Sequence, residues 1–271
     1  MSQVAYAVRI LDNAGREHCN PCDTPMEPRF KLTKGKESVA MNVTAYMSLI
    51  GSLRYLVNTR PDLDYAVGVV SRYMEALGKA HWAAVKQVLR YIKGTTGYGC
   101  SYEKGTYLKS ILLGFSDSDF AGDSEDRKST TGVIYFLGNS LVTWTSQKQK
   151  IIALSSCEAE YVAAAAAACQ GVWLSRLMAD LLGTKETPVK LLMDNMSAIA
   201  LSRNPVHHDR SKHIDTRYHF IHECIEEGRV EVEHVGTAGQ LADIFTKPLS
   251  RVKFVELRTA LDVGDVQQLR G

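Results

Sequence analysis

The sequence predicts an α/β fold: a mixed five-stranded sheet with flanking helices, preceded by a small helical segment. Two patterns favour this fold. After Gly105 three strand-like runs follow one another, and beyond them strands alternate with helices. An antiparallel start followed by alternation is typical of a mixed sheet covered by helices. A chain of 271 residues is long enough for two domains, and we expect a helical one at 1–105 and an α/β one at 106–271.

The first forty residues are rich in turn-forming residues, with three prolines close together, and we expect irregular structure there. Apolar residues then recur at helical spacing from Tyr46 to Leu56. Pro61 is placed to open a second helix, and a third extends from Trp82 to Ile92. Basic residues between these stripes could follow a phosphate backbone or form solvated helix faces. They are Arg54, Arg60, Arg72, Lys79, Lys86, Arg90 and Lys93.

Three strands are predicted next, at 107–115, 131–137 and 141–153, and residues 138–140 make a tight hairpin connection between the last two. A long helix follows. Ser155 and Glu158 have the spacing of a capping box, six consecutive alanines favour the helix, and Gly183 ends it. The remaining elements are a strand at 189–193, a short helix from Asn195, a helix at 216–227, a strand at 229–235 and a helix beginning near Gly239.

The charge balance and the cysteines bear on whether the protein binds nucleic acid and whether it is secreted. The 32 Lys and Arg residues nearly balance 30 Asp and Glu residues, so any case for nucleic-acid binding must be local. The six cysteines have no disulfide-framework spacing, and the Cys19–Cys22 pair alone is a weak zinc signal, so we expect reduced thiols in an intracellular protein. We find no export signal, and no apolar run approaches the roughly 18 residues of a membrane span.

Carboxylates stand at the ends of several predicted elements. Asp117 and Asp119 follow an apolar run that begins at Ile111, and strand spacing cannot choose between them because alternate residues share a face. Asp194 directly follows the strand at 189–193, at the end where open α/β sheets bind ligands. Asp243 lies in the first turn of the last helix, where the helix dipole alone would also favour an acid.

Glu158 and Glu160 must be separated, since residues two apart on a helix point about 200° from one another. The capping box accounts for Glu158, so Glu160 is the one expected to face the sheet. Carboxylates gathered in one pocket would repel one another unless divalent cations neutralise them. Such ligands suit Mg²⁺ or Mn²⁺, and a pair of these ions is a common catalyst of phosphodiester hydrolysis.

Six ordered segments resemble the ribonuclease H domain of copia-type retrotransposon polyproteins. They are GFSDSDFAGD (114–123), KSTTGVIYFLGNSLVTWTSQKQ (128–149), SSCEAEYVA (155–163), LLMDNMSAIAL (191–201), KHIDTRYHFIHE (212–223) and QLADIFTKPL (240–249). Upstream, residues 46–74 and 81–95 resemble the tail of the reverse transcriptase. The resemblance covers nearly the whole chain. It implies a ribonuclease H-like sheet, with residues 1–105 as a thumb- or connection-like segment of the polymerase.

The resemblance implies four metal-binding carboxylates, Asp117, Glu160, Asp194 and Asp243, which would hold two Mg²⁺ ions or Mn²⁺ in their place. The substrate would be an RNA/DNA hybrid, and the upstream polymerase part of the same polyprotein would be a partner, in the cytoplasm within a virus-like particle or in the nucleus. We expect nucleic-acid contacts from the basic stretch at 203–219 and from Asn195, which directly follows Asp194. These candidate residues are Asn195, Arg210, Lys212, His213 and Arg217.

Two features limit the predicted activity. No Asp-Asp doublet occurs in the chain, so the polymerase signature is missing and we expect no DNA synthesis. Bacterial and retroviral ribonucleases H carry a His loop shortly before the last Asp, whereas here the interval EHVGTAGQLAD (233–243) contains only His234, within a predicted strand. A catalytically inactive nucleic-acid-binding remnant is the main alternative, and another two-metal nuclease or strand transferase on the same fold is a third.

Overall fold

The computed structural model describes residues 1–28, 30, 32–34, 42–74, 77–102, 111–203 and 215–266, without the side chains of 215–219. The chain divides into two compact units. The first combines Met1–Tyr102 with Lys247–Gly271, and the second is Glu103–Thr246. The predicted division at 105/106 lies close to the first boundary. The predicted inclusion of residues 247–271 in the α/β part does not agree with these units.

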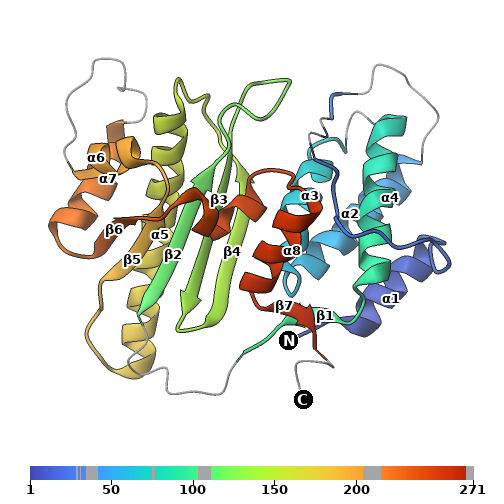
Figure 1. Ribbon diagram of the computed structural model, residues 1–271, viewed down its shortest axis with the longest axis horizontal. Helices are drawn as coiled ribbons and strands as arrows, with labels where there is room; N and C mark the ends of the chain where they lie inside the picture. Colours follow the sequence, from blue (N-terminus) through green and yellow to red (C-terminus); the bar gives the residue numbers. More distant parts are fainter. Residues whose placement is uncertain are drawn as a thin grey trace. The chain divides into compact units, whose positions relative to one another are not determined.

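The second unit contains a five-stranded sheet with the order β4-β3-β2-β5-β6 (Figure 1). Its strands are β2 (Leu112–Ser118), β3 (Thr130–Leu137), β4 (Ser140–Lys148), β5 (Val189–Met193) and β6 (Val230–His234). β2, β3 and β4 form an antiparallel meander, whereas β5 pairs in parallel with both β2 and β6. The predicted α/β fold with a mixed five-stranded sheet is therefore confirmed.

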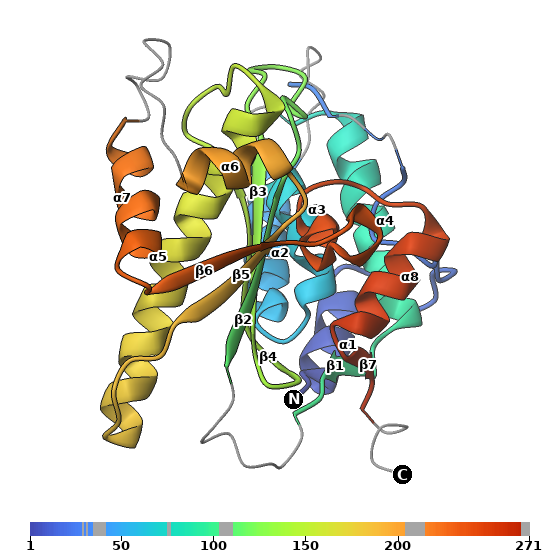
Figure 2. The same cartoon turned by 60° about the vertical axis from the view of Figure 1, so that its left-hand side comes forward.

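Helices α5 (Ser156–Leu182), α6 (Met196–Arg203) and α7 (Asp215–Glu226) lie beside the sheet (Figure 2). They share one hydrophobic core with it. The Tyr135 hydroxyl donates to the Ala167 carbonyl, which places α5 on the face of β3 from which Tyr135 projects. Two short 3₁₀ helices follow β6, η4 (Thr237–Gly239) and η5 (Leu241–Phe245). Gly132 packs against η5, and because Gly132 and Tyr135 are three residues apart on a strand, η5 and α5 cover opposite faces.

Several boundaries follow from local signals in the sequence. The Ser155 hydroxyl accepts from the Glu158 N–H at 3.1 Å at the start of α5, and Gly183 adopts φ +62° at its end. The expected helix near Gly239 is instead the 3₁₀ helix η5, and β4 ends at Lys148 rather than Ala153. β2 begins at Leu112 and extends to Ser118, and residues 107–110 of the predicted strand lie outside the described residues.

One described helix, α5, is long and apolar enough by composition to cross a membrane, and 56% of its most apolar window is buried. Most of its alanines pack into the core of this unit. The helix therefore has the burial pattern of a core helix, although the sequence alone led us to expect no candidate span.

The first unit is a helical bundle with one small β-pair. Its elements are α1 (Val4–Asn13), α2 (Val43–Val57), η1 (Pro61–Leu63), α3 (Asp64–Ser71), α4 (Lys79–Gly94), β1 (Tyr98–Cys100), α8 (Arg251–Ala260) and β7 (Val263–Asp265). The three predicted helices are present, but the expectation of irregular structure at 1–40 was wrong for α1. The C-terminal segment belongs here because β7 pairs with β1 and Phe254 packs edge-on against Tyr91.

Candidate metal centre

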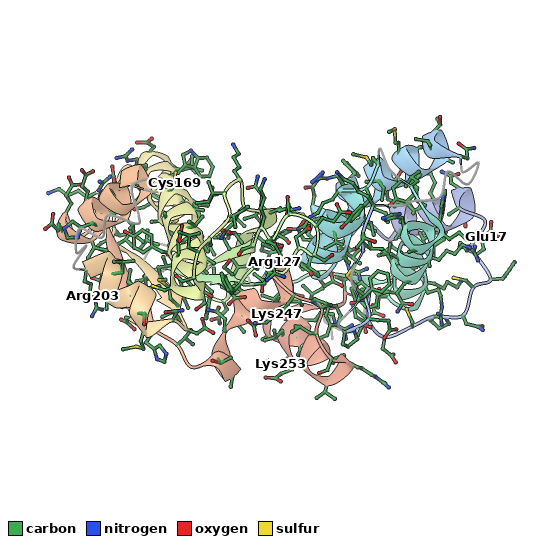
Figure 3. All side chains as sticks on the ribbon, turned by 90° about the horizontal axis from the view of Figure 1, so that it is seen from above. Glu17, Arg127, Cys169, Arg203, Lys247 and Lys253 are labelled. Atoms are coloured by element: carbon green, nitrogen blue, oxygen red, sulfur yellow. The ribbon has the colours of Figure 1, made fainter. Side chains whose placement is uncertain are left out.

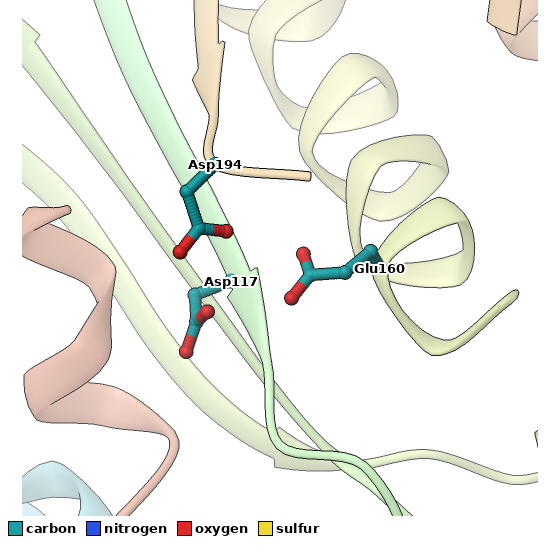
Figure 4. A group of neighbouring side chains, drawn as sticks. All are labelled: Asp117, Glu160 and Asp194. Carbon is teal, nitrogen blue, oxygen red and sulfur yellow. The ribbon is translucent and has the colours of Figure 1, made fainter. Parts of the chain in front are cut away.

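Three carboxylates meet at one end of the sheet in the second unit. One oxygen from each of Asp117, Glu160 and Asp194 lies within 4.8 Å of the others (Figure 4). Asp117 and Glu160 are buried, and Asp194 is partly exposed. Among the described residues, these three carboxylates therefore form a group that could hold a metal ion.

The two aspartates are neighbours because of the parallel pairing of β2 and β5. Phe115 is in register with Leu192, so Asp117 and Asp194 both lie two residues beyond that pair. The carboxyl ends of parallel strands meet at one edge of a sheet, and this edge is where α/β folds place ligands. The side chains of Asp117 and Asp194 therefore lie close together at this edge of the sheet.

Glu160 reaches this edge from the first turns of α5. Its Oε1 accepts from the Ser118 N–H at 3.2 Å, next to Asp117. Glu158 points elsewhere: its Oε2 accepts from the Leu154 N–H at 2.8 Å, just before the N-cap of the helix. The capping argument therefore placed the two glutamates as the structure has them.

Asp119 lies outside the group. Its side chain accepts from the Thr130 N–H, and its own N–H donates to the Thr130 carbonyl at 3.3 Å. These bonds close the connection between β2 and β3. Strand spacing left Asp117 and Asp119 open, and of these two residues Asp117 lies in the group.

Asp243 is also outside this group, although it is buried close by on η5. The helix is attached to β2 by Gln240, whose Nε2 donates to the Ser116 carbonyl at 2.9 Å. The Thr246 hydroxyl donates to Asp117 Oδ2 and lies 3.2 Å from the Asp243 carbonyl. The structure therefore brings together three of the four predicted carboxylates and places the fourth on the adjoining element.

The predicted nucleic-acid contacts are only partly described. Asn195 Oδ1 accepts from the Ala198 N–H at 3.0 Å and so caps α6. Arg217 lies on α7 without a described side chain, and Arg210, Lys212 and His213 lie outside the described residues. His234 is the last residue of β6 and is exposed, in agreement with its predicted place in a strand.

Polar residues around the group were missed by sequence reasoning. Gln149 is buried, and its Nε2 lies 3.0–3.1 Å from Ser118 Oγ, Thr131 Oγ1 and the Ala159 carbonyl. Gln149 thereby connects β2, β3 and the residue before Glu160. The signal available in the sequence was the run of polar residues at 146–150, which reads equally well as a solvated segment.

Known proteins resemble this chain strongly in sequence. It is 41% identical over 261 residues to the retrovirus-related Pol polyprotein from transposon TNT 1-94 of Nicotiana tabacum, and 42% identical over 254 residues to that from transposon RE2 of Arabidopsis thaliana. Each match covers 94% of this chain. The chain belongs to the Pol polyproteins of copia-like retrotransposons. It spans 19% and 17% of the lengths of these two Pol polyproteins.

No family model matches this chain. Among solved structures, it resembles LC11-RNase H1, isolated from compost by a metagenomic approach, with 15% identity and a TM-score of 0.39. That match covers 51% of this chain and 93% of the other.

Proposed function

We propose that residues 103–246 form a ribonuclease H that hydrolyses the RNA strand of RNA/DNA hybrids with divalent metal ions. The observation that supports this most is the meeting of Asp117, Glu160 and Asp194 at the end of β2 and β5. Membership of the copia-type Pol family supports the choice of substrate. We extend the proposal to the whole chain by expecting no polymerase activity, since it contains no Asp-Asp doublet.

The donor set fits a hard divalent cation. The group offers carboxylate oxygens, with neither Cys nor His, and oxygen ligands are those that Mg²⁺ and Mn²⁺ prefer. Asp117, Glu160 and Asp194 would hold the metal, and we keep Asp243 as a candidate fourth ligand. Two bound ions would activate a water and stabilise the leaving 3′ oxygen.

The chain's own residues position and shield this chemistry. Asp117 and Glu160 are almost fully buried, so their charges act where water is scarce and electrostatic interactions are strong. Asp194 is partly exposed and therefore marks the side from which a phosphodiester would approach. Arg210, Lys212, His213 and Arg217 remain candidate contacts to the hybrid backbone, because they belong to a basic stretch of the sequence.

The test is hybrid cleavage by the full chain in Mg²⁺. Asp194→Asn keeps the shape of the side chain and removes its charge, so it should lower cleavage by at least about 100-fold, because even residues that only support a metal ligand contribute about 10- to 100-fold. Asp180→Asn is the matched control, since Asp180 is exposed on α5, and it should cleave like the parent chain.

Two other results would contradict the proposal. A parent chain that cleaves duplex DNA or single strands as well as the hybrid would instead be a different two-metal nuclease. A parent chain that binds the hybrid but cleaves nothing would be the inactive nucleic-acid-binding remnant.

A further inference from the structure

We propose that Thr246 is a positioning residue that orients the Asp117 carboxylate for metal binding. This inference rests on the proposed function, because it assigns the metal-binding role to Asp117. Thr246 directly follows η5 and is fully buried. Its hydroxyl donates to Asp117 Oδ2, which ties a proposed metal ligand to an element that reaches the sheet 129 residues later in the chain.

A glycine on strand β3 lets η5 pack closely against the sheet beside Asp117. Gly132 is in register with Asp117 on the neighbouring strand β3. A Cβ atom at Gly132 would lie 2.8 Å from the Ala242 carbonyl oxygen and 2.8 Å from Thr246 Cγ2. Since real Cβ contacts are almost never this short, only glycine lets the backbone of η5 approach this strand so closely.

Two further hydrogen bonds hold η5 against the sheet. Gln240 Nε2 donates to the Ser116 carbonyl at 2.9 Å, and the Ser146 hydroxyl of β4 donates to the Phe245 carbonyl at 2.6 Å. The element is therefore attached to β2 before its first residue and to β4 at its last. Thr246 follows directly, so its hydroxyl is presented to Asp117 from a fixed backbone.

A donor on one carboxylate oxygen restricts the rotation of the carboxylate, and so sets the direction in which its oxygens would face a bound metal. Groups that hydrogen-bond to metal ligands in this way typically contribute about 10- to 100-fold to metal affinity or activity. Thr246 does not belong to the acidic group, and it acts only through Asp117.

The experiment compares Thr246→Val, which keeps the shape and removes the hydroxyl, with Thr246→Ser, which keeps the hydroxyl. Mn²⁺ binding to the full chain is measured by electron paramagnetic resonance of the free ion, and hybrid cleavage is measured over a Mg²⁺ titration. We expect Thr246→Val to weaken Mn²⁺ binding and to raise the half-saturating Mg²⁺ concentration, each by about 10- to 100-fold. Thr246→Ser should stay within a few fold of the parent. Thr145→Val, an exposed site on β4, should change neither value.

Circular dichroism without metal checks that each variant folds, and Thr246→Ala replaces Thr246→Val if the valine variant does not. A second comparison uses an Asp117→Asn background, where loss of the hydroxyl should have no further effect, since coupled residues are not additive. Additive losses in that background would overturn the proposal, and so would parent-like Mn²⁺ binding by folded Thr246→Val.

The metal measurement also separates this inference from the proposed function. Normal Mn²⁺ binding by a parent chain that cleaves no hybrid would reject the ribonuclease activity, while loss of that binding in Thr246→Val would still support the role of Thr246. A parent chain that cleaves hybrids while Thr246→Val binds metal normally would reject the role of Thr246 alone. A parent chain that binds no Mn²⁺ would overturn both.

Discussion

Glu158 and Glu160 lie two residues apart on α5, and their carboxylates contact different parts of the second unit. Glu158 accepts from the Leu154 N–H before the helix, and Glu160 accepts from the Ser118 N–H beside Asp117. The helical period made this separation predictable, because the two side chains must point in different directions. The helical period alone did not show which residues lie close to Glu160, since those contacts come from strands distant in sequence; its grouping with Asp117 and Asp194 was implied only by the family resemblance.

We predict that Glu160→Gln raises the melting temperature of the metal-free chain. Three carboxylates with oxygens within 4.8 Å of one another repel, and removing one charge relieves that repulsion. If Mg²⁺ binds this group as we propose, it should raise the melting temperature of the parent chain, because a ligand stabilises the state that binds it. Glu160→Gln should remove most of that rise. Thermal unfolding with and without Mg²⁺ measures both effects.

Glu158→Gln is the matched control for this prediction. A Gln side chain still offers a carbonyl oxygen to the Leu154 N–H, so the helix start should survive and the Mg²⁺ response should equal that of the parent. If the Mg²⁺ response were lost in Glu158→Gln and kept in Glu160→Gln, the wrong glutamate would have been assigned to the metal centre.

At the scale of elements, the sequence predicted the helices and strands whose ends are set by neighbouring residues in the chain. The Ser155 cap, the alanine run and Gly183 gave α5, and the apolar run at 189–193 gave β5 with its observed bounds. The last helix was misjudged because η5 is held as a short 3₁₀ turn by Gln240 and Ser146, which are tertiary contacts. In contrast, α1 had a readable signal, since Ala7, Ile10 and Leu11 form one buried stripe.

The contacts of Gln149 also lead to a prediction about elements. Gln149→Leu should destabilise the second unit by roughly 1–3 kcal/mol, because it leaves buried polar groups on β2, β3 and α5 without this amide donor. Gln147→Leu, an exposed site two residues earlier, should stay within about 0.5 kcal/mol of the parent. Urea unfolding followed by circular dichroism compares them, and equal stabilities would mean that Gln149 does not hold these elements together.

At the scale of the whole molecule, the two units bury charge in different ways. The second unit gathers carboxylates, whereas the first buries a compensated pair in which Arg60 Nη2 lies 2.7 Å from Asp62 Oδ2. Arg60 also donates to the Thr95 carbonyl and hydroxyl, and Tyr91 donates to Asp62. The sequence suggested that Arg60 belonged to a solvated or phosphate-binding face. Both interpretations of Arg60 were wrong, because its side chain is buried. The partners that compensate its charge, Asp62 and the Thr95 carbonyl, cannot be recognised from the helical spacing of apolar residues.

The buried pair makes the stability of the first unit depend on pH. Burial alone would raise the pKa of Asp62, but the Arg60 guanidinium and the Tyr91 hydroxyl hold it below its usual value. Because the folded pKa is the lower one, the stabilisation is fully present above the unfolded value of about 3.9 and is lost as pH falls through the folded value.

Asp62→Asn should therefore cost about 3–5 kcal/mol at pH 7, the range expected when one member of a buried pair is removed. Its stability should then fall less than that of the parent between pH 7 and pH 3. Urea unfolding followed by the fluorescence of Trp82 reports on the first unit once Trp144 and Trp173 are replaced by Phe, since the chain has 3 tryptophans. Asp12→Asn on the exposed side of α1 is the control and should keep the pH response of the parent. If Asp62→Asn lost as much stability as the parent on acidification, the pH response would come from other carboxylates and the pair would not control it.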